Sequence, residues 1–382
     1  MSITRRVFAL NLSALALSAC GGAPAPSRPR PAPSIATAPD LRPAANAGYD
    51  AWVASFKTRA AAKGISSRTL SAGFRNAGYL PGVLTRSRNQ TEFKRTLEDY
   101  LSIAASDERV QKGRAAFQRH RGTLNALEAK YGVRAEIIAA IWGLESFYGE
   151  RRGDISVIAA TSTLAYAGRR KRFFETQLVA ALKILQNGDI SPARMTGSWA
   201  GAMGHTQFIP TSYQAYAVDY TGDGRRDIWS EDPSDALAST AAYLKRNGWT
   251  RGLTWGGLAG SVAASGSTIQ PQAGGPSFTV TSNFRAIKRY NNSDAYALGV
   301  GHLADRIGGA APLRANFPPD KNGLTKADRV RLQRRLTASG FDTEGSDGVI
   351  GPKTKSAISA YQRSRGLPVT GNPSPELLRQ IG

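Results

Sequence analysis

The stretch AEIIAAIWGLE, residues 135–145, decides the fold of the central part of this chain. Its apolar residues recur three and four positions apart, Ile137, Ile141 and Trp142 among them, which predicts a helix with a buried face. Glu145 lies on the same face, four residues after Ile141. A carboxyl there is either paired with a cation or desolvated and protonated. A protonated carboxyl in an apolar pocket suits the general acid of a glycosidase, whereas a pair with arginine would be structural, and the pattern alone allows both.

Around this helix the chain divides into five segments. Residues 49–307 are mainly helical in pattern, with glycine-rich connections. Residues 308–325 carry glycine and proline without periodicity and predict a linker, and residues 326–382 form a compact helical module. Residues 1–19 predict a signal peptide, and residues 20–48 a tether. The expected fold class is therefore mainly α.

Two stretches interrupt the helical pattern of the large domain. Residues 197–213 are rich in glycine. Residues 251–281 are rich in glycine, serine and proline, and they predict short strands or a hairpin.

The N-terminus has the layout of an export signal. Arg5 and Arg6 precede an apolar run that ends at Leu17 and is too short to span a membrane. The sequence LSAC ending at Cys20 resembles a bacterial lipobox, which implies a lipid on Cys20; the alternative is a chance cysteine in a plain signal peptide. The paired arginines also resemble a twin-arginine signal, so two export routes stay open.

The tether and the location follow from the residues after Cys20. Residues 21–47 hold seven of the 20 prolines, a composition that cannot bury a core. Gly21 is not the aspartate associated with retention in the inner membrane of enteric bacteria. We expect a periplasmic protein that is anchored by its lipid in the outer membrane.

The formal net charge of +22 favours a polyanionic partner. Nucleic acid is the usual partner of such a charge, but the chain has none of the aromatic and basic motifs of nucleic-acid-binding modules, so we expect no nucleic acid. For an exported chain, the carboxylates of peptidoglycan peptides and anionic lipid surfaces are the expected polyanions. A solvated basic surface without a specific partner is the alternative, and protein partners are not indicated.

Five blocks of sequence resemble, in order, the membrane-bound lytic murein transglycosylase B family. They are IWGLESFYG at 141–149, GSWAGAMG at 197–204, QFIPTSY at 207–213, residues 219–229, and RYNNS at 289–293 followed by Tyr296. The resemblance implies a lysozyme-like catalytic domain of the goose-type and transglycosylase kind. It also implies that Glu145 acts first as acid and then as base.

The implied reaction is non-hydrolytic cleavage of the β-1,4 bond from N-acetylmuramic acid to N-acetylglucosamine, which leaves a 1,6-anhydro end. Ordinary glycosidases need a second carboxylate. Glu150 and Asp154 lie near in sequence but outside the matched blocks, so we expect them at the surface. The alternatives are a hydrolysing muramidase and a non-catalytic, peptidoglycan-binding structural lipoprotein.

The resemblance also implies substrate-binding residues. Ser198 and Gln207 match residues near the acid, and Tyr243, Tyr290 and Tyr296 match aromatic residues of the glycan groove, although tyrosines here can also be core residues. Arg169 and Arg170 match a basic pair implied to meet stem-peptide carboxylates, but they lie in a longer basic run that can be merely solvated. His205 and Thr206 stand where we expect tyrosine and glycine.

Residues 219–227, DYTGDGRRD, space oxygen ligands as an EF-hand loop does. The predicted calcium ligands are Asp219, Thr221, Asp223, Arg225, Asp227 and, by resemblance, Asp235. An Asx-rich turn without an ion is the alternative. The chemistry itself requires no cofactor, and the three isolated histidines predict no zinc site.

The C-terminal module resembles the three-helix peptidoglycan-binding domain. The resemblance rests on residues 347–354 (DGVIGPKT), 357–362 (AISAYQ) and 366–371 (GLPVTG). It implies binding to the cell wall, although such a fold can also be a passive spacer.

Overall fold

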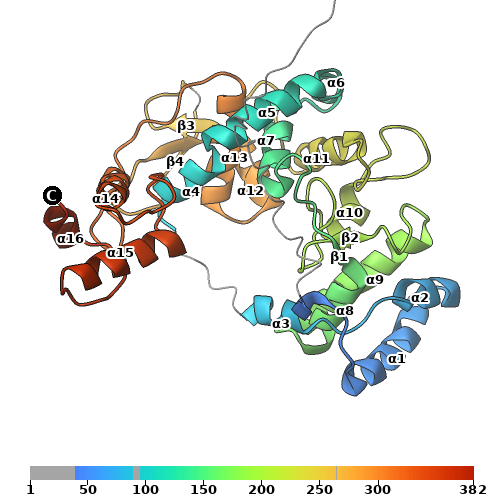
Figure 1. Ribbon diagram of the computed structural model, residues 1–382. Coiled ribbons are helices and arrows are strands. Elements are labelled where there is room, and N and C mark those ends of the chain that lie inside the picture. The colour runs from blue at the N-terminus through green and yellow to red at the C-terminus, as the bar shows by residue number, and fades with distance from the viewer. Residues whose placement is uncertain (1–38, 89–94, 264) are drawn as a thin grey trace, which may run out of the picture.

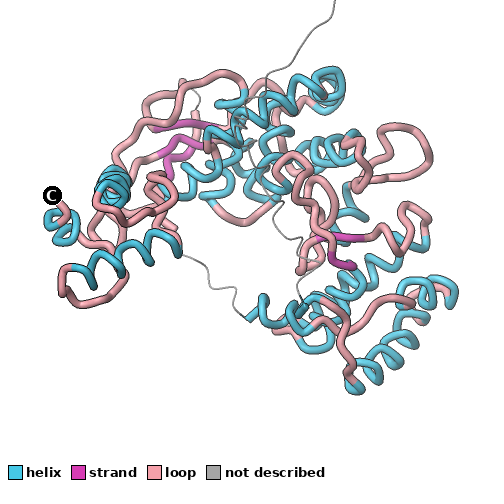
Figure 2. The backbone as a smooth tube through the Cα atoms, in the orientation of Figure 1, coloured by secondary structure: helices cyan, strands magenta, loops and turns pink. Residues whose placement is uncertain are grey.

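The structure is a computed structural model that describes residues 39–88, 95–263 and 265–382. It is mainly helical, with a few short strands (Figures 1 and 2). The mainly α fold class is confirmed. The predicted signal peptide and Cys20 lie outside the described residues. None of the described helices combines the length and the apolar composition that a membrane crossing requires.

A first group of helices packs around α8 and α9. Its members are η2 (Pro39–Leu41), α1 (Ala47–Ala61), α2 (Ser67–Phe74), α3 (Pro81–Arg88), α8 (Val157–Ala167), α9 (Lys171–Gln186) and α10 (Pro210–Tyr216). Several begin at a side-chain cap; the Asn46 oxygen accepts from the Tyr49 amide at 2.9 Å, for example. The fully buried Val83 and Leu164 lie in the small core between α3 and α8.

A second group surrounds the predicted catalytic helix, α7 (Ala135–Ser146). The helices that contact α7 are α5 (Asp107–Arg119), α6 (Arg121–Tyr131), α11 (Ser234–Arg246) and α13 (Asp294–Ile307), and α4 (Leu97–Ala104) and α12 (Ser282–Tyr290) pack on α13. The α13 helix runs against α7, α4 and α5 (Figure 1). Because helices cover α7 on several sides, Ile137, Ile138 and Ile141 are fully buried, as the apolar stripe predicts.

Two small sheets accompany the helices. β1 (Ile155–Ser156) pairs with β2 (Thr196–Gly197), next to the glycine-rich segment. β3 (Gly256–Leu258), β4 (Ser267–Ile269) and β5 (Phe278–Val280) form an antiparallel sheet in the order β3-β5-β4. The strands expected between residues 251 and 281 are thus present.

The C-terminal module has its own core. Its helices are α14 (Lys326–Ala338), α15 (Pro352–Ser364) and α16 (Pro375–Gln380), and Leu332, Leu336 and Ile358 are fully buried between them. The buried Arg329 pairs with Asp320 at 3.1 Å and also with Asp99 of α4. This charged contact fastens the module to the large domain, beside α4 (Figure 1).

Candidate active site

Glu145 lies in the last turn of α7 and is partly buried. Its Oε1 accepts a hydrogen bond of 2.6 Å from the hydroxyl of Tyr296, on α13. Burial raises the pKa of Glu145 to about 7, and the hydrogen bond from Tyr296 offsets only part of this increase. Among the described residues neither a cation nor a second carboxylate contributes to this shift. A desolvated carboxyl paired with a neutral hydroxyl keeps its proton at neutral pH, as a general acid must.

The other predicted aromatic residues cluster beside Glu145. The rings of Tyr243 and Tyr290 meet edge to face, with centroids 4.9 Å apart. The Tyr243 hydroxyl donates to the Arg289 carbonyl at 2.5 Å, and the Tyr290 hydroxyl to the Thr206 carbonyl at 2.6 Å. Tyr243 and Tyr296 are both buried; Tyr296 contacts Glu145 directly, whereas Tyr243 packs on Tyr290.

The glycine-rich segment holds the two polar residues predicted near the acid. The Ser198 hydroxyl accepts from the Ala202 amide at 3.1 Å. Gln207 has a positive φ of 53°, a conformation that places its amide group against the turn, where it donates to the carbonyls of Arg152 and Gly204. Both side chains are therefore held in place by the local backbone.

His205 stands where we expected a tyrosine. Its ring links the catalytic helix to Ser230 through hydrogen bonds. Its Nδ1 accepts from the Trp142 indole at 3.1 Å, and its Nε2 lies 2.7 Å from the Ser230 carbonyl. These two partners require the neutral form with the proton on Nε2. Burial lowers the pKa of His205, which favours that form. The His205 carbonyl also accepts from the hydroxyl of Ser146 at 2.5 Å, directly beside Glu145.

The chain reverses sharply after the catalytic helix. Phe147, Tyr148 and Gly149 all have positive φ, of 53°, 60° and 89°. The Tyr148 ring fills the space beside Gly143, where a Cβ would lie 2.5 Å from its hydroxyl. Such strained conformations cluster at functional sites. Here the reversal ends α7 one residue after Glu145 and leaves the acid in the final turn.

Three cations surround the ring of Phe147. The side chains of Arg109, Lys112 and Arg151 lie 5.1, 4.7 and 4.5 Å from its centroid. Glu150 is exposed and pairs with Lys112 at 2.6 Å, and Asp154 is exposed too, as expected of both acids. The positive charge thus lies beyond the end of α7, while Glu145 itself has a neutral partner.

Arg169 and Arg170 lie elsewhere, in the turn between α8 and α9. Both are exposed, and the Arg170 guanidinium stacks on Phe173 at 4.0 Å. The structure does not bring them into contact with the tyrosine cluster in any hydrogen bond or ion pair of the described chain.

The predicted metal loop brings three of its carboxylates together. Asp219, Asp223 and Asp235 each place an oxygen within 4.8 Å of the others. The Thr221 hydroxyl lies beside Asp219, at 3.4 Å from its Oδ1. Asp227 departs from the expectation based on spacing, because its carboxylate pairs with Arg194 at 3.1 Å and caps the Trp229 and Ser230 amides.

Arg225 stands at the position of an EF-hand loop that binds the ion through its backbone carbonyl, so the prediction does not require its side chain to face the ion. Its amide donates to Asp223 at 2.9 Å, and its side chain lines a separate cavity near α2 and α9.

Two family models match most of the chain between them. The family model for the transglycosylase SLT domain matches residues 48–264 and 259–305, and that for a peptidoglycan binding domain matches residues 325–381. The chain belongs to the transglycosylase SLT family. As a member with a peptidoglycan-binding domain, it is a lytic transglycosylase that acts on peptidoglycan.

Relatives of this SLT family member include enzymes of known structure. It is 32% identical over 241 residues to membrane-bound lytic murein transglycosylase B of Escherichia coli, covering 54% of this chain and 66% of that protein. SltB3 of Pseudomonas aeruginosa, solved with NAG-NAM-pentapeptide, is 41% identical, with a TM-score of 0.69 over 88% of this chain and 100% of SltB3. Slt35 of E. coli, solved with calcium, is 27% identical, with a TM-score of 0.58 over 69% of this chain and 93% of Slt35.

Sequence reasoning missed several residues that shape the site. Neither the partnership of Tyr296 with Glu145 nor the network of His205 was predicted, because each joins segments far apart in the chain. Tyr100 was also missed; burial and the charge of Glu145 raise its pKa to about 12. One indication of these contacts was present in the sequence, the histidine at position 205 in place of the expected tyrosine.

Proposed function

We propose that this lytic transglycosylase cleaves the β-1,4 bond between N-acetylmuramic acid and N-acetylglucosamine with Glu145 as its single acid and base, and that it leaves 1,6-anhydro-muramic acid ends. The observation that carries the proposal is the isolated, desolvated carboxyl of Glu145. Its pKa of about 7 reflects burial, and its hydrogen-bond partner among the described residues is the neutral hydroxyl of Tyr296.

The absence of a second carboxylate at this carboxyl, within the described chain, disfavours both ordinary glycosidase mechanisms. A retaining enzyme places its nucleophile about 5 Å from the acid, and an inverting enzyme needs a base to activate water. With one carboxyl, the 6-hydroxyl of the same muramic acid can attack, because it is already at high effective concentration. Glu145 gives its proton to the leaving oxygen and then, as a carboxylate, takes the proton of that hydroxyl.

The remaining predicted residues serve binding in this proposal. Ser198 and Gln207, which the local backbone holds in place, hydrogen-bond the sugar or its acetamido group. The substrate's own acetamido group stabilises the oxocarbenium-like centre. Tyr243, Tyr290 and Tyr296 form the wall of the groove next to the acid.

The exposed pair Arg169 and Arg170 binds carboxylates of the peptide stems in the same proposal.

The experiment is mass spectrometry of the soluble products released from purified sacculi by the full chain in detergent. Wild-type enzyme should release products with 1,6-anhydro ends, and Glu145→Gln, which cannot donate a proton, should release none. Reducing ends in the wild-type digest would replace the proposal with a hydrolase. A wild-type chain that binds sacculi but releases nothing would replace it with a structural lipoprotein.

We further propose that calcium stabilises the loop of residues 219–235. Calcium takes oxygen ligands at about 2.4 Å, so two ligands of one ion lie at most about 4.8 Å apart, and the carboxylates of Asp219, Asp223 and Asp235 meet that limit. Thr221 and the backbone of Arg225 complete the expected set, and Asp227 supports the loop through Arg194. Bound calcium would supply charge neutralisation and rigidity, not catalysis.

Calorimetric titration tests the calcium site directly. Calcium should bind the wild-type chain and raise its melting temperature, and Asp223→Asn should weaken both effects. Asp342→Asn, in a loop of the C-terminal module, is the matched control. Equal melting temperatures of the wild-type chain with calcium and with chelator would contradict the site.

The membrane anchor is likewise a proposal. A lipid on Cys20 and the proline-rich residues that follow would hold the enzyme in the outer membrane, facing the periplasm. Cys20→Ala should move the chain from the membrane fraction to the soluble periplasm. Retention of this variant in the membrane fraction would contradict lipid anchoring.

A further inference from the structure

A cleft of about 1220 Å³ lies between the catalytic domain and the C-terminal module. One wall comes from α4, the start of α5, the turn after α7 and the end of α13; the other comes from α14 and residues 346–349. Residues 312–317 of the connecting segment close one side. Because Arg329 pairs with Asp99 across the two domains, and Lys326 donates to Ser102 at 2.8 Å, the two walls are held together. A ligand in the cleft would touch both domains.

The cleft is rich in cationic groups. The cationic residues of its lining are Arg109, Arg151, Arg306, Arg314, Lys326 and Arg334. Arg151, Arg314 and Arg334 are exposed, and no carboxylate of the described residues lies within ion-pair distance of them. Guanidinium groups that the protein itself leaves unpaired are suited to bind carboxylates in the bidentate manner.

Two further arginines of the lining have donors that the fold leaves unsatisfied. The Nε atoms of Arg109 and Arg306 are buried and have no hydrogen-bond partner in the described structure. Buried donors without partners are rare because they are costly. An acceptor that draws either guanidinium toward the cleft recovers part of that cost.

The cleft begins close to the catalytic acid. Phe147 lines it and follows Glu145 by two residues, and Arg109 lies against the ring of Phe147. Tyr100 lies near both Glu145 and Arg109, because the charges of both groups act on the pKa of its hydroxyl. An extended peptide spans about 3.4 Å per residue, so a stem of five residues attached to a muramic acid at Glu145 reaches roughly 17 Å.

We propose that this cleft binds the peptide stem of the muramic acid at the cleaved bond, with the stem carboxylates on Arg151, Arg314 and Arg334. Such a stem carries several carboxylates and an amine, and the cleft lining matches that mixture, because Glu98, Asp107, Glu108 and Asp347 line it together with the more numerous cationic residues. The site differs from Arg169 and Arg170, which lie between α8 and α9. The inference rests on the proposed function and adds that the two domains bind one stem together.

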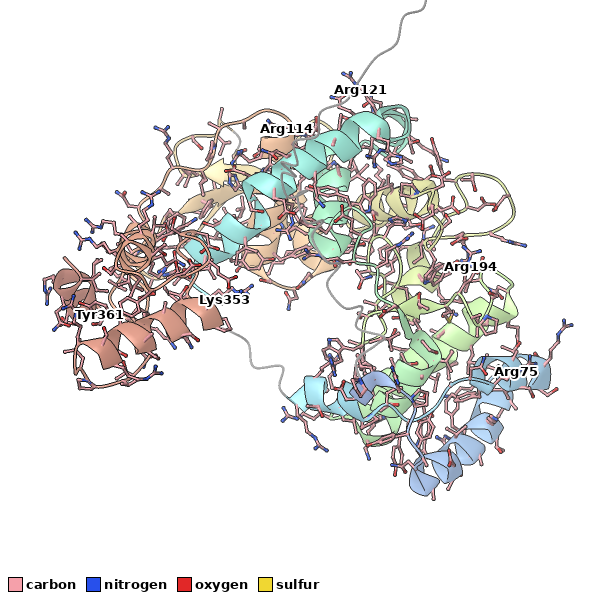
Figure 3. The ribbon with its side chains drawn as sticks, in the orientation of Figure 1. Arg75, Arg114, Arg121, Arg194, Lys353 and Tyr361 are labelled. Carbon is pink, nitrogen blue, oxygen red and sulfur yellow. The ribbon has the colours of Figure 1, made fainter. Side chains whose placement is uncertain are left out.

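The test compares two substrates with two double variants of the full chain. Arg314→Gln/Arg334→Gln removes two unpaired cations from the cleft. Arg75→Gln/Arg121→Gln removes two exposed, unpaired arginines far from the module, one directly after α2 and one at the start of α6 (Figure 3). Each enzyme is assayed on glycan strands that carry their stems and on the same strands after an amidase has removed the stems.

The ratio of kcat/KM on stem-bearing strands to that on stripped strands is the readout. We expect the cleft variant to lower this ratio about tenfold, the effect of losing two partly exposed ion pairs, and the control variant to leave it unchanged. An equal loss on both substrates, or no loss, would overturn the proposal. A wild-type enzyme that cleaves neither substrate would instead overturn the proposed function.

Direct binding provides a second readout that does not depend on turnover. Full-length Glu145→Gln is titrated with a muramyl peptide and with the same peptide after amidation of all its carboxyl groups. The acidic peptide should bind about tenfold more tightly, and adding Arg314→Gln/Arg334→Gln should abolish that preference. Equal affinity for the two peptides, or no measurable affinity for either, would refute the site even if cleavage is normal.

Discussion

Replacing Glu145 with glutamine should stabilise the folded protein at alkaline pH and leave its stability nearly unchanged near pH 4.5. Burial raises the pKa of Glu145 from its ordinary 4.5 to about 7. Between these two values the unfolded chain has lost the proton that the folded chain retains, so unfolding releases a proton and stability falls as pH rises. Each tenfold change in proton affinity is about 1.4 kcal/mol, so ionising Glu145 costs the folded state about 3 kcal/mol above pH 7.

Glutamine keeps the shape and the acceptor for Tyr296 but has no ionisation cost. The free energy of unfolding of the variant should therefore exceed that of wild type by an amount that grows from near zero at pH 4.5 to about 3 kcal/mol at pH 8. Urea unfolding followed by tryptophan fluorescence measures it, because all six tryptophans lie before residue 256, in the catalytic domain. Glu150→Gln, at an exposed site, is the control. A difference that does not depend on pH would refute a desolvated Glu145.

Three other substitutions test the surroundings of the acid. Tyr296→Phe removes the hydrogen bond that lowers the pKa of Glu145, so activity should persist to higher pH than in wild type; an unshifted alkaline limb of the pH–rate profile would contradict this role. Gly143→Ala places a Cβ 2.5 Å from the Tyr148 hydroxyl and should cost about 1–3 kcal/mol in urea unfolding, whereas Gly122→Ala, in open space on α6, should cost nothing. His205→Phe leaves the Trp142 indole without an acceptor, while the Ser230 carbonyl keeps its hydrogen bond from Arg152, so we expect a loss of about 1–3 kcal/mol and a lower kcat with KM little changed; a lower melting temperature with normal kcat would limit His205 to a structural role.

The sequence predicts the parts of this molecule that depend on local periodicity. The apolar stripe of residues 135–145 is a buried helix, and the glycine- and proline-rich stretch after residue 251 contains strands. Glu145 itself could be found because its position on that stripe is a local property. Its partner could not be predicted, because Tyr296 lies 151 residues away in the chain. The apolar pattern of one helix does not indicate which side chain of another helix contacts it.

The same limit explains the metal loop. Spacing places Asp219 and Asp223 on one turn, and the structure keeps them together with Asp235. Spacing alone also assigns Asp227 to the ion, but Arg194, from a different part of the chain, pairs with its carboxylate. Arg194 competes with the ion for the Asp227 carboxylate only because the fold brings it there, and the sequence of the loop alone cannot predict this contact.

The distribution of charge reconciles two requirements of this enzyme that conflict. A chain of net charge +22 favours an acidic polymer, yet a cation beside Glu145 would hold the carboxyl ionised and remove its ability to donate a proton. The structure separates the two kinds of group in space. Within the described residues the hydrogen-bond partner of the Glu145 carboxyl is the neutral hydroxyl of Tyr296, whereas Arg109, Lys112 and Arg151 surround Phe147, beyond the end of the helix. The chain turns away from the helix at residues 147–149, and Arg109 and Lys112 come from α5, so the basic groups lie around Phe147 while burial keeps the acid protonated.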